Sequence, residues 1–251
     1  MNFLENTHYL LSAKLLREKV PSFEEYPFNL EVVRNFESLE FHPKVTFIIG
    51  ENGSGKSTLL EAIATAWGFN PEGGTKNFNF ATRSSHSYLH EYFRLVKSFR
   101  KAKDGFFLRA ESFYNVASNI DQLDEEPAFG PPIKNSYGRK SLHHQSHGES
   151  FFSLMTHRFG GNGLYILDEP EAALSPTRQM AMLSRIHQLA EQDSQFIIAT
   201  HSPIILAYPQ ARIYEIRNGI LYTREYTQTE HYSITKSFLN HYQEMTNQLL
   251  K

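Results

Sequence analysis

Residues 50–58 read GENGSGKST and match the pattern G-x-x-x-x-G-K-[ST], with Gly50, Gly55, Lys56 and Ser57 at its fixed positions. Glycines let the backbone curl so that consecutive N–H groups point at phosphate oxygens, and the helix that follows presents its positive N-terminus to the same anion. Lys56 adds a positive charge at the outer phosphates, and the Ser57 hydroxyl is available to Mg²⁺. The stretch predicts a nucleotide phosphate site made of Gly50, Glu51, Asn52, Gly53, Ser54, Gly55, Lys56, Ser57 and Thr58.

The flanking residues support this interpretation. VTFIIG (45–50) is typical of a buried strand, and GKSTLLEAIATAWG (55–68) has apolar residues at helical spacing with Gly68 placed as a stop. A glycine-rich turn that contains a lysine by chance would not have a strand before it and a helix after it.

Two later strands are expected to complete the site. LYILDEP (164–170) is an apolar run that ends in two carboxylates, and FIIATHSP (196–203) is an apolar run that ends in Thr200 and His201. Ligands bind at the carboxyl ends of strands in an open parallel sheet. We therefore expect Asp168 to hold Mg²⁺, Glu169 to polarise the attacking water and His201 to sense the γ-phosphate.

The rest of the pattern alternates between strands and helices. It predicts helices over 8–19, 55–68, 90–103, 151–159, 175–192 and 233–250, strands over 28–33, 39–41, 45–50, 105–112, 164–169 and 195–200, and a closing hairpin from about 211 to 226. Residues 120–148 read as a loop-dominated insertion. Such alternation indicates an α/β fold with a mostly parallel sheet covered on both faces.

Composition excludes several classes of protein. The 251 residues include no cysteine, which rules out disulfides and cysteine zinc sites. The net charge of −2 gives no overall positive charge that would call for nucleic acid or an acidic membrane, although a local basic patch is compatible with it. The chain has no pattern of a signal peptide and no run of about 18 apolar residues, so we expect a cytoplasmic protein. His143, His144 and His147 have no carboxylate framework, and we favour a surface or dimer contact over a zinc site.

The LDEP strand followed by the THSP strand, 32 residues on from Glu169 to His201, resembles the pattern of ABC-type ATPases. The chain as a whole resembles small stand-alone bacterial ATPases of this type (AAA family, SMC/RecF-like), through GENGSGKSTLLEAIA, FFLRAESF, SHGES and LDEPEAALSP. The resemblance implies a P-loop NTPase fold in which one ABC-type ATPase domain fills residues 1–251. It places the core lobe at about 1–112 and 159–251 and a small helical or irregular signature lobe at about 113–158.

The resemblance also implies a signature motif, for which QSHGES (145–150) is the counterpart. Ser146, His147, Gly148 and Glu149 would act in trans, on nucleotide held by a second subunit. Glu149 departs from the glutamine of the family, because a carboxylate repels phosphate. Ser146 and Glu149 also suit a capping box at the start of a helix, and both roles can hold together.

Three other family positions are less well matched. Ser175 stands where the family has an aspartate that reaches across the dimer. Glu111 is the candidate for the glutamine that touches Mg²⁺ and water. Arg34, Asn35 and Phe36 are the adenine-side candidates if the site follows SMC and RecF-type heads, with Tyr26 as the competitor if it follows transporter domains.

The expected function is ATP hydrolysis by an ATP-dependent homodimer in which two subunits, arranged head to tail, enclose two ATP molecules, with ATP and Mg²⁺ as cofactors. One alternative is the nucleotide-binding subunit of an ABC transporter, and another is a DNA-repair-type ATPase head, for which a basic helix face with Arg94, Lys97, Arg100, Lys101 and Lys103 is the only indication. A non-hydrolysing switch is a third alternative, which Glu169 argues against.

Overall fold

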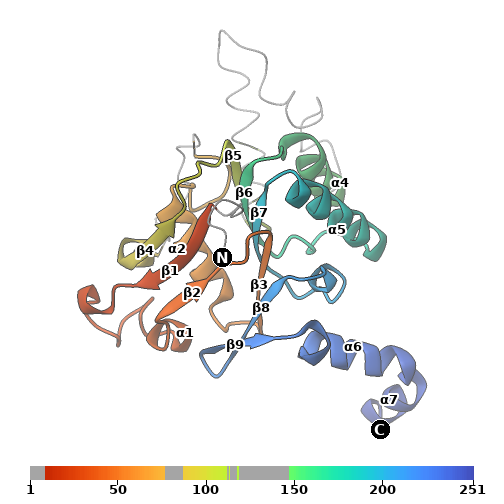
Figure 1. Cartoon of the computed structure of the whole chain (residues 1–251). Helices are drawn as coiled ribbons and strands as arrows, with labels where there is room; N and C mark the ends of the chain where they lie inside the picture. Colours follow the sequence, from red (N-terminus) through yellow and green to blue (C-terminus); the bar gives the residue numbers. More distant parts are fainter. Residues whose placement is uncertain (1–8, 77–86, 112, 114–117, 119–146) are drawn as a thin grey trace.

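A computed structural model describes residues 9–76, 87–111, 113, 118 and 147–251. Its centre is a six-stranded sheet with the order β5-β6-β7-β3-β8-β9 (Figure 1). The strands are β3 (Val45–Gly50), β5 (Asp104–Arg109), β6 (Gly163–Asp168), β7 (Gln195–Ala199), β8 (Arg212–Arg217) and β9 (Ile220–Arg224). Only the β8–β9 hairpin is antiparallel within this sheet, so the predicted mostly parallel α/β fold is confirmed.

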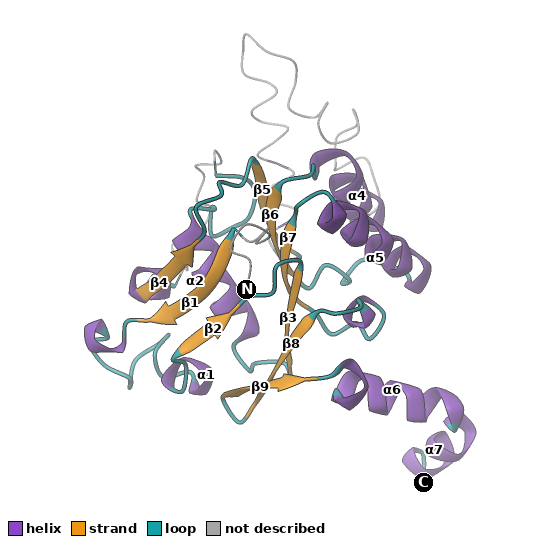
Figure 2. Ribbon diagram, viewed as in Figure 1, coloured by secondary structure: helices purple, strands orange, loops and turns teal. Residues whose placement is uncertain are grey.

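The sheet lies between two apolar layers, because alternate residues of its buried strands point to opposite faces. On β3, Val45, Phe47 and Ile49 belong to one core cluster and Ile48 to the other. The first layer contains α5 (Pro176–Glu191), α4 (His147–Ser153) and the π-helical turn η5 (Leu154–Arg158). The second contains α2 (Lys56–Trp67) (Figure 2).

A small antiparallel sheet, ordered β2-β1-β4, packs on the α2 side. Its strands are β1 (Leu10–Leu15), β2 (Ser38–Glu40) and β4 (Phe93–Lys97). The fully buried side chain of Gln195 joins it to the main sheet: Oε1 accepts from the backbone N–H groups of Tyr9 and Leu10, and Nε2 donates to Leu10 O at 2.8 Å and His42 O at 3.1 Å. A buried amide with all these partners fixes where β1 lies.

The start of β5 is held by the carboxylate of Asp104. It accepts hydrogen bonds from Arg158 at 2.8 Å, the Tyr165 hydroxyl at 2.7 Å and the Gly160 N–H at 3.2 Å. Burial alone would raise the pKa of Asp104, but the Tyr165 hydrogen bond and the Arg158 charge outweigh it and lower the pKa. The network ties the end of η5 to the central sheet.

Short helical segments connect these strands, and two helices end the chain. The segments are η1 (Arg17–Lys19), α1 (Glu31–Arg34), η2 (Tyr88–Tyr92), η6 (Ile205–Ala207) and η7 (Tyr226–Gln228). The last helices are α6 (Glu230–Asn240) and α7 (Tyr242–Leu249), which extend away from the body of the molecule (Figure 1). Within the described residues, no helix combines the length and apolar character that a membrane crossing requires.

Four predicted elements were wrong. The helix expected over 8–19 is strand β1 followed by η1, and the strand expected over 28–33 contains α1. The helix expected over 90–103 is η2 and strand β4, which pairs with β1, so its basic helix face does not exist. The single helix expected over 233–250 is α6 and α7. Short apolar runs fit both periods, and pairing with distant strands decides between them.

Candidate nucleotide site

The candidate site lies at the carboxyl ends of neighbouring parallel strands. β3 runs between β7 and β8, and β7 pairs with β6 on its other side. The loop of residues 50–55 follows β3, Asp168 ends β6 and His201 follows β7 by two residues. Three segments that are far apart in sequence therefore reach one edge of the sheet, where α/β proteins bind their ligands.

The loop between β3 and α2 needs glycine at Gly55. This residue has φ +89°, and a Cβ there would lie 2.5 Å from Val32 Cγ1 of α1. Lys56 begins α2, is 4% exposed, and its Nζ donates to the carbonyls of Gly50 at 2.9 Å and Glu51 at 2.8 Å. Burial lowers the pKa of Lys56, although the nearby carboxylates of Glu169 and Asp168 oppose the shift. An ammonium buried in this way gains from a bound anion.

A hydrogen bond joins the loop to the end of β6. The Ser57 hydroxyl donates to Asp168 Oδ1 at 3.1 Å. Burial raises the pKa of Asp168 to about 7, although the charge of Arg109 and the bond from Ser57 act against this shift. Hydroxyl and carboxylate oxygens are the ligands that Mg²⁺ prefers, and a cation at this point would favour the ionised carboxylate. The residues present therefore fit a magnesium ion bound with nucleotide phosphates.

Glu169 and His201 lie beside this pair. Glu169 has φ +50°, uncommon for a residue other than glycine, and its N–H donates to Ala199 O at 2.9 Å. Its Oε1 is 3.5 Å from His201 Nε2, and both side chains are partly exposed. Burial lowers the pKa of His201, and the charge of Lys56 acts in the same direction. A carboxylate and a neutral imidazole thus face the site together.

Glu171 holds the backbone of His201 in place. Its Oε1 accepts the His201 N–H, and its Oε2 is buried with no hydrogen-bond partner in the described part of the chain. Burial raises the pKa of Glu171, although hydrogen bonds from the His201 backbone and Thr200 act against this. Glu171 therefore connects the segment after β6 with the segment after β7.

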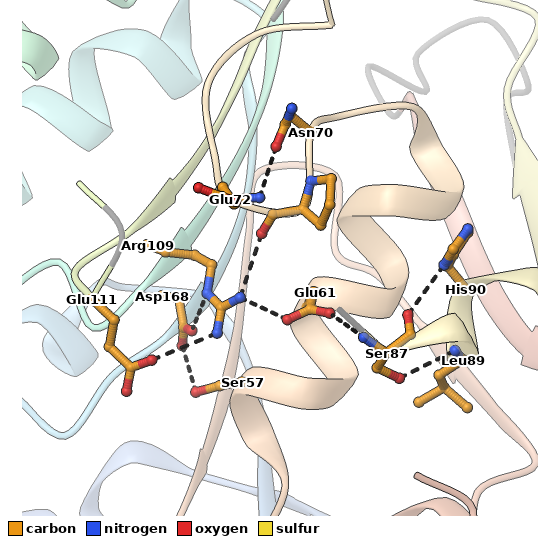
Figure 3. Close-up of polar contacts among 11 residues, drawn as sticks. Ser57, Glu61, Asn70, Glu72, Ser87, Leu89, His90, Arg109, Glu111 and Asp168 are labelled. Carbon is orange, nitrogen blue, oxygen red and sulfur yellow. Dashed lines mark hydrogen bonds and ion pairs between the residues drawn. The ribbon is translucent and has the colours of Figure 1, made fainter. Parts of the chain in front are cut away.

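Arg109, the last residue of β5, is the centre of an ion-pair network (Figure 3). Its guanidinium is 2.6 Å from Glu61 Oε2 on α2, and its Nε is 3.8 Å from Asp168 Oδ2. The side chains of Arg109, Glu61 and Asp168 are 15%, 10% and 7% exposed. Arg109 thus brings a fixed positive charge to the carboxylate expected to hold Mg²⁺.

Glu111, the candidate for the glutamine position, is placed differently from these buried groups. Its side chain is 86% exposed and its Oε2 is 3.7 Å from Arg109. Among the described residues, Glu111 thus forms an ion pair with Arg109.

The signature residues lie only partly within the described chain. Ser146, His143 and His144 fall outside it, and α4 begins at His147. A Cβ on Gly148 would be 2.5 Å from Ala173 O, so the first turn of α4 packs tightly on the loop after β6. Glu149 lies 3.6 Å from Arg178 of α5, a pairing that offsets its negative charge. Ser175 caps α5, accepting from the Arg178 N–H.

A pocket of about 980 Å³ opens beside the phosphate loop. The adenine-side candidates do not line it: Phe36 is 1% exposed and packs on Phe93, Arg34 pairs with Glu24 at 2.9 Å, and Asn35 and Tyr26 are exposed elsewhere. Its lining comes from the turn before α1, the phosphate loop, the β8–β9 hairpin, His201 and α6. These residues are Asn29, Leu30, Glu31, Gly50, Glu51, Asn52, Gly53, Ser54, His201, Glu215, Ile216, Arg217, Asn218, Gly219, Glu230, His231, Ile234 and Thr235.

Sequence reasoning missed three residues of the site. Arg109 could have been predicted, because it is a charged residue at the end of an apolar strand, the position in which site residues of a parallel sheet lie. Glu171 could not, because nothing in the sequence two residues after Glu169 indicates its contact with His201. His231 belongs to α6, and no local pattern brings a residue near the C-terminus to the phosphate loop.

Comparisons with known proteins agree with this arrangement. The AAA domain family matches residues 26–244. An ABC transporter ATP-binding protein of Methanothermobacter marburgensis is 26% identical over 226 residues, which are 77% of this chain and 73% of that protein. The L-cystine transport system ATP-binding protein TcyN of Escherichia coli is 26% identical over 196 residues, 69% and 76% of the two chains.

Some relatives are much longer than this chain. It spans 24% of the ABC transporter G family member STR2 of Medicago truncatula and 28% of the macrolide export protein MacB of Campylobacter jejuni. Among solved structures, CbiO1 of Clostridium perfringens, part of an ABC transporter complex, superposes with a TM-score of 0.50 at 18% identity, covering 92% of this chain and 95% of that one. At that identity the likeness shows the fold.

The matched region contains the phosphate loop, the Asp168–Glu169 pair and His201. The parallel sheet brings these residues together at one edge. From the family match and the fold we conclude that the chain belongs to the AAA domain family and has the fold of an ABC-type P-loop ATPase.

Proposed function

We propose that the protein binds Mg·ATP and hydrolyses it to ADP and phosphate in a head-to-tail homodimer. The observation that carries the proposal is the hydrogen bond of 3.1 Å between Ser57 and Asp168, beside the buried Lys56. It joins the phosphate loop to the carboxylate at the end of β6. Glu169 and His201, which hydrolysis would require, lie next to it.

Each residue then has a definite task. The loop amides and Lys56 bind phosphate oxygens, and Lys56 exchanges its bonds to Gly50 and Glu51 for the anion. Ser57 and Asp168 would hold Mg²⁺, which neutralises charge on the phosphates when bound. Glu169 accepts a proton from the attacking water, and His201 Nε2 donates toward the phosphate oxygens. Ser146 and Gly148 of a second subunit would complete the site, as their resemblance to a signature motif suggests.

Binding and hydrolysis are tested by titration calorimetry with Mg·ATP and by phosphate release. We expect measurable affinity and slow turnover, with Lys56→Ala losing binding and Lys101→Ala, a surface control, keeping both. A folded wild-type protein without ATP affinity down to millimolar concentration would overturn the proposal.

A second candidate function is the ATP-binding subunit of a membrane transporter. It is favoured by the names of the M. marburgensis and E. coli relatives, which both describe such subunits. We favour a non-transporter ATPase because the SHGES signature resembles that of ATPases outside transporters. Purification of tagged Glu169→Gln protein from a detergent extract decides between them, since a transporter subunit would bring down a polytopic membrane protein.

A further inference from the structure

The C-terminal helix α6 forms one wall of the pocket beside the phosphate loop. Glu230, His231, Ile234 and Thr235 of α6 line the pocket together with Gly50–Ser54 of the loop. Neither α6 nor α7 has a buried residue. The start of α6 is attached to the body by Glu230, which is 3.4 Å from Arg217, and the preceding η7 is attached by Tyr226, whose hydroxyl donates to Pro203 O at 2.9 Å. The first turn of α6 is therefore tied to the body of the molecule.

His231, in this first turn, is hydrogen-bonded to His201. The distance between His201 Nδ1 and His231 Nε2 is 3.3 Å, and the ring centroids are 5.4 Å apart. The outer nitrogens, His201 Nε2 and His231 Nδ1, are buried and have no hydrogen-bond partner within the described residues. Glu169 Oε1 lies 3.5 Å from His201 Nε2. A carboxylate and two imidazoles thus follow one another from the site to α6.

The direction of the bond between the two rings follows from their charge states. Burial lowers the pKa of both histidines, and the positive charge of Lys56 lowers both further. The negative charge of Glu169 opposes the shift of His201. The charges of Glu215 and Glu230 oppose the shift of His231. Each ring is then neutral near pH 7 and has one N–H. The Glu169 carboxylate favours an N–H at Nε2 of His201, which leaves Nδ1 as an acceptor. His231 must therefore donate from Nε2.

We propose that His231 is a positioning residue that holds His201 as the Nε2–H tautomer, with that N–H directed at the γ-phosphate side of the site. The effect of this tautomer on catalysis rests on the proposed ATP hydrolysis, because only the Nε2–H form of His201 can donate to a phosphate oxygen. His231 acts through His201 and does not itself need to touch the nucleotide. Because His231 belongs to α6, the orientation of His201 depends on how the C-terminal helices pack against the body of the molecule.

Three substitutions of His231 separate this role from packing. In His231→Gln an amide nitrogen can donate from about the position of Nε2, and we expect most of kcat to remain. His231→Leu removes the donor, and His231→Glu offers only an acceptor. Both should lower kcat by ~10–100-fold with ATP affinity unchanged, a loss of the size found when the partners that orient metal-bound histidines are removed. His241→Leu, the same change at an exposed histidine after α6, should behave as wild type.

The tautomer itself can be read without nucleotide. In ¹⁵N-histidine-labelled protein, the ring nitrogens of His201 are assigned by comparison with His201→Gln. We expect wild type and His231→Gln to show protonation at Nε2 of His201, and His231→Glu to show it at Nδ1. An Nδ1–H tautomer in wild type would overturn the proposal, as would an unchanged His201 spectrum in folded His231→Glu. If wild type hydrolyses no ATP, the proposed function fails, whereas this spectrum still decides the tautomer.

Discussion

Ser57 and Asp168, 111 residues apart in the chain, are joined by a hydrogen bond of 3.1 Å. Asp168 is 5% exposed, and burial raises its pKa to about 7. A buried carboxylate with one hydroxyl partner and an arginine at 3.8 Å is costly to ionise without further positive charge. A cation beside the pair would favour the ionised form of Asp168, which supports the proposed Mg²⁺ site. The residues around it can be tested separately.

Glu169→Gln should keep ATP binding and lose most hydrolysis. The amide has nearly the shape of the carboxylate but cannot take a proton from water, and loss of a general base costs about 10²–10⁴-fold in rate. Calorimetry and phosphate release measure the two effects. Glu91→Gln, the same change at an exposed glutamate of η2, is the control. Near-normal turnover in Glu169→Gln would place the base elsewhere, with Glu111 the next candidate.

Arg109→Met should destabilise the protein strongly. The substitution removes the partner of Glu61, which lies at 2.6 Å. Because the Glu61 side chain is only 10% exposed, water cannot replace that partner. Removing one member of a buried pair costs about 3–5 kcal/mol, whereas replacing both members by apolar residues costs far less. Urea unfolding of Arg109→Met, Glu61→Leu and the double variant measures this, with exposed Arg94→Met as the control. If the double variant loses the sum of the two single losses, the network is not coupled.

Arg109 shows where sequence reasoning ends. The phosphate loop, Asp168, Glu169 and His201 each follow a buried strand, and residues in that position share one edge of a parallel sheet, so their proximity could be predicted from local patterns. Arg109 and His231 meet the site from β5 and α6, and their partners are set by tertiary contacts alone. The same limit explains β1 and β4, which are distant in sequence and yet pair with each other. It also applies to Gln195, whose side chain binds the backbone of Tyr9, 186 residues away. The spacing of apolar residues within a segment does not indicate which distant segment it pairs with.

Asp104 should contribute stability that depends on pH. Its pKa in the folded protein is lowered, because the Tyr165 and Arg158 hydrogen bonds outweigh burial. Such a group stabilises the fold above its unfolded pKa of about 3.9, and the contribution is lost as pH falls through the lower, folded pKa. Asp104→Asn should therefore be less stable by about 1–3 kcal/mol at pH 7. Urea unfolding at pH 7, 5 and 3 should show an unchanged difference from wild type between pH 7 and pH 5 and a smaller difference at pH 3, below the unfolded pKa of about 3.9. An equal difference at every pH would mean that the charge of Asp104 is not what stabilises the fold.

The dimer makes the most specific prediction, because Ser146 and Gly148 would act on nucleotide bound by Lys56 and Ser57 of the other subunit. Specific activity should rise with protein concentration, and ATP should shift Glu169→Gln from monomer to dimer in size exclusion with light scattering, whereas ADP should not. Lys56→Ala and Ser146→Arg should each be inactive alone. In a mixed dimer one composite site collects both lesions and the other collects neither, so mixing should recover part of the activity. Two differently tagged preparations of Lys56→Ala, mixed in the same way, are the control and should recover nothing. A strict monomer that hydrolyses ATP, or mixed dimers that form without activity, would count against action in trans.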